Sequence, residues 1–102
     1  MTRLQKMVDV LDQIGDKFNL DVIDLRILAE AQRHWGEGRD VRVTDLVRVF
    51  SIASPATMHY RISRDLVRVG MLKLRANPED MREKLVEKGK RYEELHNFVE
   101  GL

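Results

Sequence analysis

The segment from Ser54 to Gly70 constrains the fold more than any other stretch of the chain, because it carries the signals for both ends of one helix. Ser54 is a favoured N-cap residue, and Pro55 follows at the first helical position, where its missing amide hydrogen costs nothing. Gly70 can take the left-handed conformation that commonly follows the last helical residue. The sequence therefore predicts one helix over residues 55–69.

This predicted helix has two faces of different chemistry. At about 100° per residue, one side is apolar and is expected to face a core, while the opposite side is polar and basic. Asp65 is predicted at the edge, paired with Arg61 one turn earlier. The apolar side consists of Met58, Ile62, Leu66 and Val69, and the outward side of Ala56, Thr57, Tyr60, Arg64 and Val67, with Arg61 and Arg68 on one shoulder and His59 and Ser63 on the other.

Two further helices are expected near the N-terminus. Thr2 begins a capping-box pattern, and apolar residues then recur at helical spacing over residues 3–14, with Gly15 as the expected stop. Asp21 is the expected N-cap of a second helix, which ends at Gly36. The apolar face of that second helix is wide, which predicts a central position in the core.

Residues 41–53 lead into the helix over 55–69. Residues 41–43 alternate like a short strand, and Thr44 is the expected N-cap of a two-turn helix over residues 45–50. A three-residue turn over 51–53 then completes a helix-turn-helix spanning residues 44–70. The inner face of the two-turn helix is expected to consist of Leu46, Val47 and Phe50.

The chain after Gly70 predicts a β-hairpin and a last helix. Residues 71–75 alternate apolar and basic, residues 76–80 have turn chemistry, and residues 81–86 can return as a second strand. This hairpin, a wing over residues 71–86, is followed by helical spacing over residues 87–101. Leu72 and Leu74 are expected to face the core, with Lys73 and Arg75 outward.

Positive charge gathers in the middle of the chain. Residues 39–75 carry eight Lys and Arg against three Asp and Glu, whereas residues 1–38 and 76–102 each have a net charge of −2. A basic centre between acidic flanks favours a polyanion as partner.

Together, the predicted helices and strands indicate a single domain over residues 1–102, mainly α with a small β-wing: a winged helix-turn-helix with about five helices and a two- or three-stranded antiparallel sheet.

Such a domain predicts a regulator that binds double-stranded DNA sequence-specifically, with residues 55–69 in the major groove and the wing at the backbone or minor groove. Arg64 is the first candidate for reading a base, because arginine can donate two hydrogen bonds to guanine. Asp80 and Glu79 at the wing tip repel phosphate unless they orient Arg82. The full set of predicted DNA contacts is Ser54, Ala56, Thr57, Tyr60, Arg61, Arg64, Arg68, Lys73, Arg75, Arg82 and Lys84.

An enzyme is not expected. His34, His59 and His96 lie on three different predicted helices, and no glycine-rich phosphate loop or metal-ligand spacing is present. The absence of cysteine excludes disulfides and thiolate chemistry. No motif indicates a cofactor, a metal or an effector ligand. No apolar run reaches the roughly 20 residues that cross a bilayer, so we expect a cytoplasmic protein with no membrane contact.

Two statements about partners remain open from the residues alone. The apolar stripes of the first helix (3–14) and the last (87–101) exceed what one small core needs, which predicts a homodimer through them. A winged helix can also dock on another regulator or on a replication or transcription assembly. The basic, polar outward face of residues 56–68 favours DNA over that alternative.

Six short motifs, in this order and spacing, resemble the multiple-antibiotic-resistance regulator (MarR) family over residues 20–92. The resemblance implies a winged-helix transcriptional regulator, usually homodimeric through its terminal helices, whose wing Asp and Arg, here Asp80 and Arg82, work at the DNA. The chain departs from the family in a helix one residue longer before Gly70, a shorter wing, and Val86 in place of a threonine. The motifs are Leu25-Arg26-Ile27-Leu28, Val43-Thr44-Asp45-Leu46, Ser54-Pro55-Ala56-Thr57, Gly70-Met71-Leu72, Asp80-Met81-Arg82 and Glu87-Lys88-Gly89.

Overall fold

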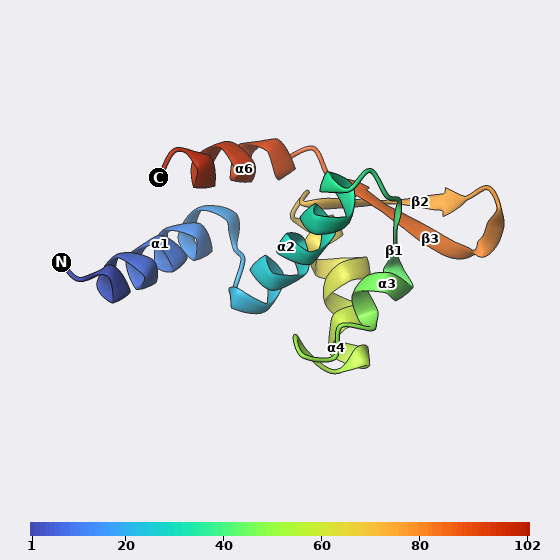
Figure 1. The fold of residues 1–102 in the computed structure, drawn as a ribbon, viewed down its shortest axis with the longest axis horizontal. Coiled ribbons are helices and arrows are strands. Elements are labelled where there is room, and N and C mark those ends of the chain that lie inside the picture. The colour runs from blue at the N-terminus through green and yellow to red at the C-terminus, as the bar shows by residue number, and fades with distance from the viewer.

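Five helices and a three-stranded antiparallel sheet make up the fold in a computed structural model that describes residues 1–102 (Figure 1). One of the five helices is continuous but changes its hydrogen bonding along its length, and its parts are labelled α4, η1 and α5. The predicted class, mainly α with a small β-wing, is confirmed. The elements are α1 (Arg3–Phe18), α2 (Val22–Gly36), β1 (Val41–Arg42), α3 (Val43–Val47), α4 (Pro55–Tyr60), η1 (Arg61–Asp65), α5 (Leu66–Arg68), β2 (Leu72–Asn77), β3 (Asp80–Lys88) and α6 (Tyr92–Glu100).

The molecule is elongated, 50 × 26 × 25 Å, with the wing at one end and both termini at the other (Figure 1). α1 and α6 reach away from the rest of the chain toward the termini. Between the two ends, sixteen buried residues from the helices, the sheet and the connections between them form one core, which includes Phe18, Ile27, Leu46 and Met71. No helix is both long enough and apolar enough to cross a membrane.

The wing is a hairpin whose second strand lies at the centre of the sheet. The strand order is β1-β3-β2, with Leu72 opposite Lys88 and Arg75 opposite Leu85. β1 adds only two residues, pairing Val41 with Val86 on the other side of β3. The short β1 thereby joins the hairpin to the helices.

Side-chain caps fix the starts of α1 and α2 as predicted. Thr2 and Gln5 form a reciprocal capping box at α1, and Asp21 and Asp24 form another at α2. The predicted stop of the first helix at Gly15 is wrong. α1 continues to Phe18, which is buried, and ends at Asn19 in the left-handed conformation (φ 57°), so an asparagine takes the place expected for a glycine.

The predicted helix over 45–50 is also shifted. α3 begins at Val43, because the Asp45 carboxylate accepts the N–H of Arg42 (3.0 Å) and pairs with its guanidinium (2.8 Å), which moves the N-cap from Thr44 to Arg42. The helix ends at Val47, and the connection to α4 therefore runs over residues 48–54 instead of three residues. Phe50, expected on the inner face, is 69% exposed on that connection.

The last helix starts later than predicted. Glu87 and Lys88 pair with Lys73 and Leu72 in the sheet, so β3 runs two residues past the predicted strand end at residue 86, and α6 starts five residues after the predicted start at Glu87. Gly89 then lies against Gly70: a Cβ at Gly89 would stand 2.2 Å from the Gly70 carbonyl oxygen. This contact between two glycine backbones joins the end of the helix over residues 55–68 to the end of the wing, and α6 begins only at Tyr92.

Candidate nucleic-acid interface

The helix over residues 55–68, together with Val69, separates its two faces as predicted. Met58, Ile62 and Leu66 are each 0% exposed, and Val69 packs partly buried against the same core. The start and stop are also as predicted: the Ser54 side chain accepts the Thr57 N–H (3.3 Å), and Gly70 has a φ of 82°. The apolar anchor therefore holds the helix with its other side toward solvent. We call residues 55–69 the recognition helix below.

The outward side of this helix presents aromatic and cationic groups. Tyr60 is 51% exposed, and the Arg64 guanidinium lies over its ring, with Cζ 5.2 Å from the ring centroid. Ala56, Val67 and Arg68 are exposed as predicted, while Thr57 is half-buried and its hydroxyl accepts from Ser54 Oγ (3.0 Å). Stacking on Tyr60 orders an arginine that has no carboxylate partner in the structure.

Arg61 is placed differently from the sequence prediction. Its guanidinium turns toward the start of α2, where it pairs with Asp21 (2.5 Å) and Asp24 (3.3 Å), and its side chain is only 24% exposed. The predicted pair of Asp65 with Arg61 is wrong, because Asp65 accepts from Arg68 instead (3.0 Å). A contact between residues 40 positions apart carries no local signal, and the sequence indicated Asp21 only as a helix cap.

The pKa values of the two carboxyl groups of the α2 capping box are shifted in opposite directions. Burial raises the pKa of Asp24, which is 6% exposed. Burial acts on Asp21 too, but hydrogen bonds from the Arg61 guanidinium and from the Asp24 N–H outweigh it and hold the pKa of Asp21 below its usual value. Arg61 is thereby held by at least one ionised partner at neutral pH.

The wing carries the remaining candidate cations. Lys73, Arg75 and Lys84 are exposed on β2 and β3, and Arg75 pairs across the strands with Glu87 (3.3 Å). At the tip, Arg82 is 92% exposed, and the Asp80 carboxylate accepts both its backbone N–H (3.0 Å) and its Nε (3.3 Å). Asp80 thus orients Arg82, which is the condition under which an acidic residue fits at this tip.

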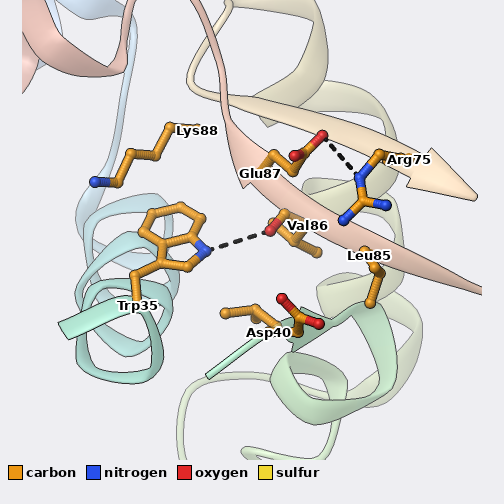
Figure 2. A pocket seen from close by; sticks show the side chains of 8 residues that line it. Trp35, Asp40, Arg75, Leu85, Val86, Glu87 and Lys88 are labelled. Carbon is orange, nitrogen blue, oxygen red and sulfur yellow. Dashed lines mark hydrogen bonds and ion pairs between the residues drawn. The ribbon is translucent and has the colours of Figure 1, made fainter. Parts of the chain in front are cut away.

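A shallow cavity of about 400 Å³ lies where the wing meets α2 (Figure 2). The Trp35 indole forms one wall and donates its Nε1–H to the Val86 carbonyl oxygen (3.3 Å). The Lys88 ammonium lies 5.6 Å from the centre of the indole ring, and the Arg75–Glu87 pair closes the opposite side. These contacts fix the base of the wing to the C-terminal end of α2. No group of three or more His, Cys, Asp or Glu side chains could hold a metal ion.

One solved structure with a related fold is the protein described as "Crystal Structure of MarR". It superposes with a TM-score of 0.63 at 20% sequence identity, over 96% of this chain and 73% of that chain. No protein-family model matches the sequence, and no curated protein matches it either. The likeness extends from α1 through the wing to α6, so this chain has a MarR-like winged-helix fold.

Proposed function

We propose that this chain is a sequence-specific regulator of transcription that binds double-stranded DNA, with the recognition helix in the major groove and the wing over residues 71–86 at the backbone or minor groove. One observation carries the proposal. The exposed Tyr60–Arg64 pair stands on a helix whose opposite side, at Met58, Ile62 and Leu66, is completely buried. The helix is therefore held rigidly with a hydrogen-bonding arginine pointing outward.

The chemistry of this outward side suits a major groove. Arg64 can donate a bidentate pair to guanine O6 and N7, and the side chains of Ala56 and Val67 can touch a thymine methyl group. Tyr60 can reach a base edge or a phosphate with its hydroxyl, and Arg68 a phosphate. Ser54 and Thr57 are hydrogen-bonded to each other at the helix start, so their main role in this proposal is to hold the first turn in position. Arg61 supports the helix from behind through Asp21 and Asp24.

The wing supplies contacts of a second kind. Arg82, oriented by Asp80, is the residue we assign to the minor groove or the adjacent phosphates. Lys73, Arg75 and Lys84 are assigned to phosphates, which adds affinity without sequence preference. The two kinds of contact predict different effects of mutation. Replacing Arg64 should reduce the preference for particular bases, whereas replacing a wing cation should reduce the affinity for all DNA sequences.

We further propose that two copies associate through α1 and α6, placing two recognition helices on successive turns of DNA. The support is an apolar surface that nothing in one chain covers. Leu4 and Met7 on α1 are 69% and 63% exposed, and Val99 on α6 is 41% exposed. Burying such side chains against a second copy removes apolar surface from water. The setting we propose is the cytoplasm, where a chain without cysteine needs no oxidising environment.

Replacing Arg64 tests the proposal. Arg64→Ala is expected to weaken binding to a preferred duplex by about 1–3 kcal/mol, or roughly 5- to 150-fold, with an unchanged Tm. Arg33→Ala is the matched control, since Arg33 is an equally charged, 65% exposed residue on α2 away from the proposed interface. A gel-shift titration at fixed salt measures both. Equal affinity of the Arg64 variant and the wild type would contradict the assignment.

A further inference from the structure

We infer that the π-helical turn η1 sets the register of the recognition helix: it keeps the buried anchor in line while fixing the direction in which Arg64 points, and so determines base preference. This inference rests on the DNA-binding function proposed above. It assigns to five residues, Arg61–Asp65, a role in specificity that is separate from the contacts their side chains make.

The change of hydrogen bonding along the helix is confined to this turn. The Leu66 N–H donates to the Arg61 carbonyl oxygen, five residues back. On either side the bonds are α-helical: the Met58 N–H donates to Ser54 (2.9 Å), and the Val69 N–H donates to Asp65 (3.1 Å), four residues back in each case. A π-turn of this kind accommodates one more residue per turn than an α-helix, and such turns occur frequently at functional sites.

The wider turn narrows the angle over which the three anchor residues Met58, Ile62 and Leu66 are spread around the helix. In an uninterrupted α-helix each four-residue step overshoots a full turn by about 40°, so Leu66 would stand about 80° from Met58. All three side chains are 0% exposed, so each is in contact with the core on this side of the helix. Because more residues are needed to complete the π-turn, the step from Ile62 to Leu66 takes back the overshoot. The turn thus aligns the three anchor side chains.

Contacts at both ends hold the turn in place. Arg61, its first residue, is tied to Asp21 and Asp24 at the start of α2. Asp65, its last residue, pairs with Arg68 on the following turn. Arg64 is the cation within η1 that has no carboxylate partner, and it lies over Tyr60. The geometry of the turn therefore decides where the free guanidinium points.

Removing one residue from the turn separates the anchor from the reading direction. Ser63 is half-buried and makes no side-chain hydrogen bond. Without it the segment can close as an ordinary α-helix with Met58, Ile62 and Leu66 still on one side. Arg64 then moves from the fourth to the third position after Tyr60, a swing of roughly half of the 100° step between residues. The stack on Tyr60 is lost and the guanidinium meets a different base edge.

The test compares two single-residue deletions. Deletion of Ser63 is expected to leave Tm within a few degrees of the wild-type value, because the anchor is kept. Deletion of Ala29, an exposed residue of α2, is the control: α2 has no wider turn that could close, so the deletion turns Ile27 and Leu28 about 100° relative to Ala31 and is expected to lower Tm strongly. Thermal unfolding followed by circular dichroism measures both. Equal destabilisation by the two deletions would overturn the inference.

Binding supplies the second measurement. Selection from a random duplex pool is done first with the wild type, and both proteins are then titrated with the duplex it prefers. The Ser63 deletion is expected to bind this duplex about tenfold more weakly and to select a different base at one position of each half-site. An unchanged preference in a folded variant would refute the role in specificity. Absence of any sequence preference in the wild type would instead contradict the proposed function. The Tm comparison would then still test whether η1 keeps the three anchor side chains aligned.

Discussion

The contact between Gly89 and Gly70 gives the sharpest prediction of stability. In Gly89→Ala the new Cβ would lie 2.2 Å from the Gly70 carbonyl oxygen, 2.6 Å from the Gly70 carbonyl carbon and 2.8 Å from the Met71 carbonyl carbon. All three atoms are backbone, so no side chain can swing away. Ordinary contact begins at 3.4 Å, and the end of the recognition helix must therefore separate from the wing by more than 1 Å.

This separation has two energetic consequences. Overpacking of this kind costs about 1–3 kcal/mol. It also strains two 2.9 Å hydrogen bonds across the junction, from the Gly89 N–H to Met71 and from the Arg91 N–H to Gly70, each contributing about 1 kcal/mol. The total is about 3–5 kcal/mol, which for a domain near 100 residues lowers Tm by about 12 °C or more.

Differential scanning calorimetry measures this shift. Gly36→Ala is the matched control, because a Cβ at Gly36 meets nothing within 4 Å and Gly36 is the last residue of α2. That variant is expected to change stability by less than about 1 kcal/mol. A Gly89→Ala protein that melts with the wild type would refute the reasoning that this glycine is required by close backbone packing.

Three further predictions concern pH, the wing tip and association. Burial acts to raise the pKa of Asp45, but hydrogen bonds from Arg42 outweigh it and lower the pKa. The stability that the ionised carboxylate gives is complete above about pH 4 and is lost as pH falls through the lower pKa of the folded state. Urea unfolding should therefore show a smaller loss of stability between pH 6 and pH 3 for Asp45→Asn than for the wild type. Equal losses would argue against this. Asp80→Ala should free Arg82 and weaken DNA binding about fivefold at unchanged Tm, whereas tighter binding would mean that Asp80 only repels phosphate. Leu4→Glu should shift sedimentation from dimer to monomer, and a monomeric wild type at micromolar concentration would count against the dimer.

The parts of the fold that follow from local chemistry were predictable from the sequence. The caps at Thr2, Asp21 and Ser54 and the stop at Gly70 are confirmed, because each depends on side chains within a few residues of the helix end. The alternation around Leu72 is likewise confirmed, since a strand places every second side chain on the same face.

The features that were missed depend on contacts between distant segments or on backbone geometry. α1 ends at Asn19 and not at Gly15, because burial of Phe18 favours one more helical turn. β3 continues past Val86 because its partner β2 is already in register there. The turn η1 has no residue signature of its own, because it is a feature of the backbone hydrogen bonding.

For the candidate site, the exposure of a side chain was easier to predict from the sequence than its ion-pair partners. Arg64 and Arg61 were both predicted to contact DNA, yet one lies over Tyr60 in solvent and the other is bound to two aspartates of α2. The difference arises from the position of α2, which periodicity cannot supply. We therefore leave Arg61 out of the residues proposed to read bases, because its guanidinium is already paired with Asp21 and Asp24.

Selection of bound sequences from a random pool of DNA duplexes, at stated salt concentration, tests the central claim most directly. A dimer that reads DNA through Arg64 should enrich two inverted half-sites about one helical turn apart, with a guanine at the position that loses its preference in Arg64→Ala. A pool that stays random after repeated rounds, with the wild-type protein folded, would contradict the claim that this winged helix reads DNA.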